Sequence, residues 1–481
     1  MPLANRIIKN SIALWSSQAF HSLVSLCAVA IIARYLGIER FGEYGFVLAI
    51  CNIFQVITDM GANQIFIREV ARQPEKVNEY FTANLIIMAI FGTLVFILIL
   101  GTVSCFHPGR HIVFAAVVGA VAVIMLFVGQ LFSAVFQAYE KMGYVAIMRS
   151  LGYAIYILFV IIAVKVDGGI VSIFTALLLQ NISACIAGYG FTRKYFFTPR
   201  VVFNGSRVRE VLLEAWPIGI KAMLRKMSYR VDILFLKALS SPVDLGLFNG
   251  IYRIILQLQF IPRNLTSALF PVFSRLSNKE ETLLADVHSR SAKFLFIGCI
   301  PLLTIFLVFP KEVISIVLGR EFIAAVPLMR ILAIALALLF FSTLFIKMLT
   351  ALNKQTWATF CVALSLAANV ICDIALIPTW GFMGAGIATL VAETLLFSLT
   401  GFLVIRYLVI RPLVSAGLKL IIAGAVMATV WVGFGAGVKW FTLIMGGLSY
   451  PLMLWVLQVF DDQESVWIQN GMRRLMGLAH V

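Results

Sequence analysis

The chain has 481 residues, of which 61% are hydrophobic and only 12% are charged, and its formal net charge at pH 7 is +16. A soluble globular protein carries about 25% charged residues, so this composition excludes a water-soluble domain of the same size. The sequence contains no soluble basic domain, so the positive charge does not indicate nucleic-acid binding.

Apolar segments follow one another along the whole chain, and most are long enough to cross about 30 Å of hydrocarbon as a helix. Their hydrophobicity is continuous and does not alternate, which favours helices over a transmembrane barrel. We predict an all-α polytopic membrane protein with about 14 transmembrane helices. The predicted spans are 11–36, 43–66, 80–104, 112–138, 145–165, 169–192, 213–237, 244–272, 293–318, 326–351, 355–377, 383–405, 414–434 and 438–460.

The loops between these spans differ in charge. Of the 38 Lys and Arg residues, 22 lie on the side of the N-terminus, the even-numbered loops and the C-terminal tail, and eight lie on the other side. Cytoplasmic loops carry the excess of Lys and Arg in membrane proteins. We therefore predict a multi-pass protein of the cytoplasmic (inner) membrane with both termini in the cytoplasm. Its basic loops would meet anionic membrane lipids.

The longest connections divide the chain into parts. We predict an N-lobe of six spans over residues 1–205, a C-lobe of six spans over residues 206–411, and two last spans with a cytoplasmic tail over residues 412–481. Arg34-Tyr-Leu and Lys237-Ala-Leu stand at corresponding places in the two halves. Internal repeats of this kind are used by many transporters to build a site between two lobes.

We assign the remaining eight basic residues to the spans themselves and not to either side of the membrane, and one such residue costs about 2.5–3.5 kcal/mol at a helix centre. Six of them lie in the spans 213–237 and 244–272, which predicts a hydrated cationic cavity. Its candidate substrate-binding residues are Lys221, Arg225, Arg230, Arg253 and Arg263. A diphosphate suits such a cavity, because Arg and Lys both bind phosphate. The alternative is that Lys221 and Arg225, near the cytoplasmic end, extend to the membrane surface and that Arg230 pairs with Asp232 or with a neighbouring helix.

Uncharged polar residues form stripes in several other spans. Asn52, Gln55 and Asn63 share one face of the second span, Gln130 and Gln137 lie in the fourth, and Asn249 and Gln257 lie in the eighth. We interpret these residues as a polar cavity lining that suits a hydroxyl-rich ligand. Hydrogen bonds between helices are an equally good explanation.

Acidic residues within the spans are few, and we identify Asp59, Asp232, Asp373 and Glu393 as candidates for ion coupling. The seven cysteines mostly lie in apolar segments and form no C-x-x-C pair, so we expect no metal site. We identify no catalytic residue and no cofactor site, and we predict that the protein is not an enzyme.

Several short motifs, taken in their order and spacing, resemble the oligosaccharide flippases of the multidrug/oligosaccharidyl-lipid/polysaccharide exporter superfamily. The matching segments are Asn10 with Ile31–Ile38, Phe41–Tyr44, Asp59–Gly61, Arg68-Glu69, Gln137–Met142, Arg230–Asp232, Ile261-Pro262, Phe270-Pro271 with Arg275, and Ile377-Pro378 with Gly381, Gly384 and Ile387–Thr389. Together they extend from residue 10 to about residue 400.

The resemblance implies two six-helix lobes around a central cavity, working by alternating access. It implies translocation of a polyprenyl-diphosphate-linked oligosaccharide for O-antigen, capsule or exopolysaccharide biosynthesis. The expected partners are this glycan, membrane lipids, and a polysaccharide polymerase with other assembly proteins. We expect a monomer.

Three alternatives stay open. A multidrug/cation antiporter of the same superfamily should present carboxylates and aromatic side chains to its substrate. A peptidoglycan-precursor lipid flippase would carry another lipid diphosphate. A membrane polysaccharide polymerase or glycosyltransferase usually needs a sizeable outer loop or domain with paired carboxylates or a metal, and the outer loops of this chain are short.

Overall fold

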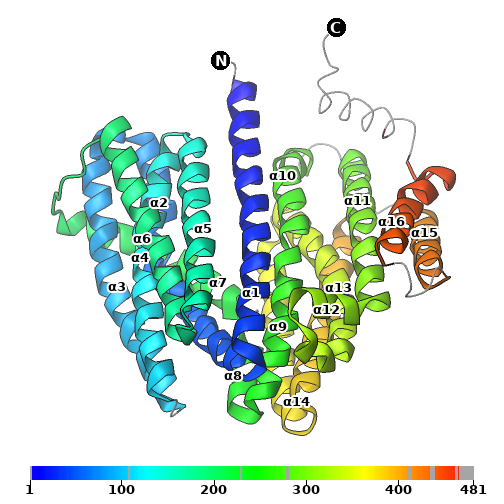
Figure 1. Cartoon of the computed structure of the whole chain (residues 1–481). Coiled ribbons are helices and arrows are strands. Elements are labelled where there is room, and N and C mark those ends of the chain that lie inside the picture. Colours follow the sequence, from blue (N-terminus) through cyan, green and yellow to red (C-terminus); the bar gives the residue numbers. More distant parts are fainter. Residues whose placement is uncertain are drawn as a thin grey trace. The chain divides into compact units, whose positions relative to one another are not determined.

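A computed structural model of the protein describes residues 3–106, 109–227, 230–277, 281–408, 414–433, 439–460 and 464 (Figure 1). The α-helices are α1 (Leu3–Asp59), α2 (Ala62–Arg72), α3 (Val77–Cys105), α4 (Arg110–Ala138), α5 (Met142–Lys165), α6 (Gly169–Tyr195), α7 (Gly205–Met227), α8 (Val231–Leu239), α9 (Pro242–Leu258), α10 (Phe260–Leu276), α11 (Glu281–Val308), α12 (Pro310–Val317), α13 (Val326–Ala351), α14 (Gln355–Tyr407), α15 (Val414–Gly433) and α16 (Lys439–Val456). Two short 3-10 helices, η1 (Pro74–Lys76) and η2 (Arg320–Ala325), complete the described elements. The prediction of an all-α polytopic membrane protein is confirmed.

The two longest helices each combine two predicted spans. The 57 residues of α1 and the 53 residues of α14 are far more than the roughly 20 that cross a bilayer. Each is kinked at a glycine with positive φ, at Gly37 (φ 68°) and Gly381 (φ 51°). A residue with a side chain would be strained in this left-handed region. Glycine therefore fixes where one span ends and the next begins.

The seventh and eighth predicted spans are interrupted, which corrects the prediction of two continuous helices. The seventh divides into α7 and α8, and Arg230 precedes the first residue of α8 with φ −140° and ψ −7°. The eighth divides into α9 and α10 at Gln259. The helix faces predicted across residues 221–232 and 249–264 are therefore not continuous, because a break rotates the residues that follow it.

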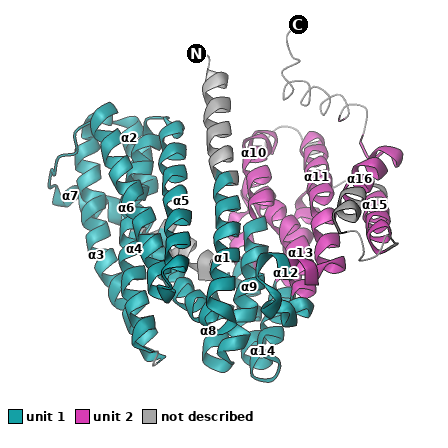
Figure 2. Cartoon of the chain, in the orientation of Figure 1, with its two compact units in different colours: residues 1–258, 314–328, 362–392 teal, residues 259–313, 329–361, 393–481 magenta. Residues whose placement is uncertain are grey.

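The chain forms two compact units (Figure 2). Unit 1 comprises residues 1–258, 314–328 and 362–392, and unit 2 comprises residues 259–313, 329–361 and 393–481. The lobe boundaries near residues 205 and 411 stay a prediction.

Within unit 1, the second half of α1 crosses α9 at very short range. A Cβ atom at Gly246 would lie 2.1 Å from the carbonyl oxygen of Ile38, and one at Gly42 would lie 2.7 Å from that of Pro242. Small residues allow helix backbones to approach in this way in membrane proteins. The crossing brings polar residues of α9 close to those of α1.

Unit 2 contains the last two helices. Buried side chains of α15 and α16, including Leu420, Met427 and Leu454, form one hydrophobic cluster with Ile300 of α11. The Tyr450 hydroxyl donates to the carbonyl oxygen of Ile297 at 3.0 Å. These contacts attach the C-terminal helices to α11.

Candidate functional site

A cavity of about 350 Å³ lies inside unit 1. Helix α1 contributes His21, Ser25, Tyr44, Asn52 and Gln55 to its wall, α5 contributes Tyr153 and Tyr156, and α6 contributes Gln180 and Asn181. Helix α9 contributes Arg253 and Gln257, and Arg230 enters from the break before α8. Five predicted residues, Asn52, Gln55, Arg230, Arg253 and Gln257, therefore line the same space.

The two arginines give the cavity its charge. Arg253 is buried, and its guanidinium carbon lies 4.7 Å from the ring centroid of Tyr44 and 5.6 Å from that of Phe41. Cation–π attraction of this kind is stronger away from water. Within the part of the chain that the structure describes, neither Arg230 nor Arg253 has an ion-pair partner. In particular, Arg230 does not pair with Asp232.

No Asp or Glu is found among the described residues that line this cavity. Two guanidinium groups facing one space without a counter-ion repel each other, and an anionic ligand would relieve that repulsion. The planar fork of each guanidinium can donate two parallel hydrogen bonds to a phosphate or carboxylate. The arrangement is therefore suited to binding an anion.

The uncharged part of the wall is rich in hydrogen-bonding groups. Gln257 donates to the hydroxyl of Ser25 at 2.6 Å, and the Asn52 side chain donates to the Leu48 carbonyl at 2.8 Å. The His21 ring stacks on Tyr153, with the ring centroids 4.1 Å apart. Amides, hydroxyls and aromatic faces are the groups that can contact a sugar.

A second hollow of about 230 Å³ adjoins the cavity, because both are lined by Leu126, Tyr153, Gln180 and Asn181. Gln130, predicted as cavity lining, lies in this second hollow together with Ser133 and Arg149. Arg149 lies on α5, near the start of the predicted span 145–165, and it lines this hollow. It has no ion-pair partner among the described residues.

Sequence reasoning missed Arg149 and the two tyrosines that follow it. Arg149, Tyr153 and Tyr156 lie at i, i+4 and i+7, so they share one face of α5. This spacing is the feature of the sequence that predicts a shared helix face for the three residues. Because Arg149 lies only four residues after the start of the predicted span 145–165, its charge alone is also explained by a position at the membrane surface.

Other predicted residues lie elsewhere. Asn63 is buried in α2, Gln137 lies near the end of α4, and neither lines the two hollows. Asn249 is buried where α1 meets α9, and its side-chain amide donates to the Phe41 carbonyl at 3.5 Å, so it serves helix packing. Arg263 belongs to α10 in unit 2, where its guanidinium donates to Gln259 at 2.7 Å. The side chains of Lys221, Arg225 and Asp59 lie outside the described residues.

Two predicted carboxylates come together in unit 1. Asp232 of α8 and Asp373 of α14 are both fully buried, and their carboxyl groups lie within hydrogen-bonding reach of each other. The Thr389 hydroxyl donates to Asp232 at 3.3 Å, and the Asn369 side chain also contacts Asp232. Both oxygens of Asp373 and one of Asp232 lack a hydrogen-bond donor in the described part of the chain. Glu393, the fourth candidate, is half-buried in the part of α14 that belongs to unit 2.

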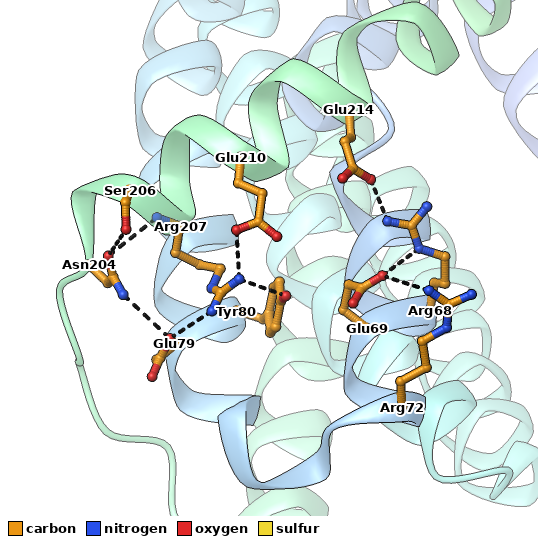
Figure 3. Close-up of polar contacts among 10 residues, drawn as sticks. All are labelled: Arg68, Glu69, Arg72, Glu79, Tyr80, Asn204, Ser206, Arg207, Glu210 and Glu214. Atoms are coloured by element: carbon orange, nitrogen blue, oxygen red, sulfur yellow. Dashed lines mark hydrogen bonds and ion pairs between the residues drawn. The ribbon is translucent and has the colours of Figure 1, made fainter.

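Two ion-pair clusters hold the first turns of α7 against α2 and α3 (Figure 3). Arg68 pairs with Glu214 and, at 2.6 Å, with Glu69, and these pairs raise the pKa of the Arg68 guanidinium. Arg207 donates to Glu210 at 2.6 Å and to the Tyr80 hydroxyl at 2.9 Å. Exposed ion pairs contribute about 0–1 kcal/mol each, so several are needed to fix one helix. They set the position of the helix that leads to Arg230.

Comparison with known proteins identifies relatives over most of the chain. A family model described as "Polysaccharide biosynthesis protein" matches residues 7–277. The chain is 23% identical over 414 residues to a putative O-antigen transporter of Shigella flexneri, which covers 79% of this chain and 94% of that protein. It is 22% identical over 400 residues to a probable low-salt glycan biosynthesis flippase, Agl15, of Haloferax volcanii, with 80% of each chain covered.

Solved structures share the fold. A lipid II flippase, MurJ, in an inward closed conformation superposes with a TM-score of 0.73 at 13% identity, covering 97% of this chain and 100% of that chain. An inward-facing multidrug resistance transporter of the MATE family superposes with a TM-score of 0.69 at 15% identity, covering 82% of this chain and 98% of that chain. At these identities the likeness concerns the fold alone.

Proposed function

Because the chain belongs to the polysaccharide biosynthesis protein family, we propose that it is a flippase for a polyprenyl-diphosphate-linked oligosaccharide. It would move this lipid across the cytoplasmic membrane for the biosynthesis of O-antigen, capsule or exopolysaccharide. The names of its relatives in Shigella flexneri and Haloferax volcanii support this substrate class.

The observation that carries the proposal is a cavity with two unpaired arginines and no acidic residue in its described wall. Arg230 and Arg253 would hold the diphosphate, the part of the substrate that pays the largest desolvation cost when it leaves water. The amides and hydroxyls around them would contact the first sugars. The polyprenyl chain would stay in the bilayer, because its transfer to water is unfavourable.

The test is transport by the purified full chain in liposomes. A fluorescent polyprenyl-diphosphate-linked disaccharide is followed by its accessibility to a membrane-impermeant reagent. Arg230→Gln and Arg253→Gln should each reduce the flipping rate about 10- to 100-fold, since a hydrogen bond to a charged group contributes about 1.5–3 kcal/mol.

Arg72→Gln is the matched control, because Arg72 is an exposed arginine already paired with Glu69. It should flip at the rate of the unmodified chain. An unchanged rate in the Arg230→Gln/Arg253→Gln double variant would contradict the proposed substrate site.

We further propose that transport is coupled to a cation at Asp232 and Asp373. Two adjacent carboxyl groups cannot both be ionised in a buried site unless a positive charge is shared between them. That charge would be a proton or a monovalent metal ion, for which the unpartnered oxygens of the pair are suitable ligands. Asp59 and Glu393 stay candidates for the same role.

The coupling is tested in the same liposomes with an imposed proton or sodium gradient. In the unmodified chain, the imposed gradient should accelerate flipping. Asp232→Asn and Asp373→Asn should each abolish this acceleration, while flipping of the substrate down its own concentration gradient continues. The double variant should behave like either single one, because the two carboxyls act as one site. Asp286→Asn, which removes the carboxylate that pairs with Arg290 in α11, should keep the acceleration. Acceleration that persists in the double variant would rule out coupling at this pair.

The alternative functions differ in what the cavity should accept. The two unpaired arginines disfavour a cationic drug. A peptidoglycan precursor carries the same diphosphate, and a lipid II flippase has the same fold as this chain. Competition by unlabelled lipid II or by a cationic dye in the flipping assay separates the three functions.

We also propose that the protein lies in the inner membrane with both termini in the cytoplasm. It would have two six-helix lobes, act as a monomer and work beside a polysaccharide polymerase.

A further inference from the structure

The connection between α6 and α7 carries exposed apolar side chains on an irregular backbone. Val201 is 82% exposed and Phe203 is 75% exposed, and Tyr195 and Val202 are also exposed. Residues 196–204 adopt no helix or strand. Figure 1 shows this connection as a loop on the outer edge of unit 1, beside α3. Contiguous exposed apolar side chains, such as those of Val201, Val202 and Phe203, mark a site of interaction with a protein or a membrane.

Side chains of α3 hold this connection in place. The Arg200 N–H donates to the Asn78 side-chain oxygen at 2.9 Å, and the Val202 N–H donates to the Thr82 hydroxyl at 3.0 Å. Phe197 packs against Phe81, with the ring centroids 5.9 Å apart. Non-helical backbone is excluded from the hydrocarbon core of a bilayer unless its polar groups are satisfied. Two such groups are satisfied here by side chains, which suits a segment at the water–lipid boundary.

Basic residues flank the apolar ones along the chain. The residues concerned are Arg193, Lys194, Arg200 and Arg209, all exposed. None of the four has a carboxylate partner among the described residues, although Arg68, Arg72 and Arg207 each have at least one. Glu210 and Glu214, the nearest acidic residues on α7, are occupied by Arg207 and Arg68. The surface therefore keeps an uncompensated positive charge next to its apolar side chains.

We propose that residues 193–209 form a docking surface for the anionic phospholipid headgroups of the surrounding bilayer. Phe203, Val201 and Val202 enter the boundary between headgroups and acyl chains, as the apolar face of an interfacial segment does. The four basic residues contact the lipid phosphates. The docked connection holds the start of α7, the helix that leads to Arg230, at a fixed depth. The inference concerns lipid contact alone and does not depend on the proposed substrate.

The test places an environment-sensitive fluorophore, NBD, on Phe203→Cys in a chain whose seven native cysteines are replaced. The labelled protein is reconstituted in nanodiscs of phosphatidylcholine alone or with phosphatidylglycerol. We expect the emission at position 203 to be blue-shifted and to be quenched by lipids spin-labelled near the headgroup. The blue shift and the quenching should both be clearly larger in nanodiscs with phosphatidylglycerol than in phosphatidylcholine alone. The same label on Glu75→Cys, an exposed position in η1, should show water-like emission in both lipids.

The charge contribution is tested by Arg200→Gln combined with Arg209→Gln. Each removed charge should weaken the phosphatidylglycerol-dependent docking about fivefold, so the difference between the two lipids should largely disappear. Arg72→Gln, whose side chain is paired with Glu69, should leave that difference unchanged. Water-like emission at position 203 in both lipids, or equal quenching in both, would overturn the proposal. The first of these results would indicate a surface open to a soluble partner.

Discussion

At the scale of single residues, the candidate site depends on how Arg253 is held. A buried guanidinium without a carboxylate partner needs other stabilisation, and the rings of Tyr44 and Phe41 provide it. These rings belong to the Phe41-Gly-Glu-Tyr44 segment, one of the motifs through which the sequence resembles the flippases. The structure thus gives that motif a physical role, because it positions a cation in the cavity.

We predict that Tyr44→Leu slows flipping about tenfold or more, whereas Tyr44→Phe stays close to the unmodified chain. A buried cation–π contact contributes about 2 kcal/mol, and phenylalanine keeps the ring that leucine removes. The rates are measured in the liposome assay with equal amounts of inserted protein. Equal rates for the leucine and phenylalanine variants would show that the ring does not position Arg253.

At the scale of elements, the close crossing of α1 and α9 is the feature most sensitive to side-chain size. The backbone of Ile38 occupies the space that any side chain at Gly246 would need. The helices can meet so closely only because glycine stands at the contact. In the predicted topology this crossing lies toward the outer side of the membrane, where the proposed alternating access would require a gate that closes.

We predict that Gly246→Leu separates α1 from α9, at a packing cost of about 1–3 kcal/mol, and strongly reduces flipping. Gly190→Leu is the control, because a Cβ atom at Gly190 meets nothing within 4 Å. Thermal unfolding of the detergent-solubilised proteins and the flipping assay report the two effects. Full activity of Gly246→Leu would mean that this crossing need not close during transport.

At the scale of the whole molecule, alternating access predicts that the cavity is reached from each side of the membrane in turn. A single cysteine at Ser25→Cys, introduced in a chain without the seven native cysteines, would report this, because Ser25 lines the cavity. An anionic, membrane-impermeant thiol reagent should label it from either side. In the Gly246→Leu variant, labelling from the outside should increase and labelling from the cytoplasm should decrease. Labelling from one side only in the active protein would contradict alternating access.

Hydrophobicity over about 20 residues is a local property, so the order of the amino acids is enough to predict a helical membrane protein and the place of most of its spans. The amino-acid sequence also identified the charged residues that lipid cannot accept, including Arg230, Arg253 and Asp232. Which of them meet was decided only by the tertiary structure. The break before α8 separates Arg230 from Asp232, and the break at Gln259 places Arg263 in another helix than Arg253. The carboxyl groups of Asp232 and Asp373, 141 positions apart in the chain, come together. Such breaks depend on contacts between distant helices, which the periodicity of a single segment does not contain.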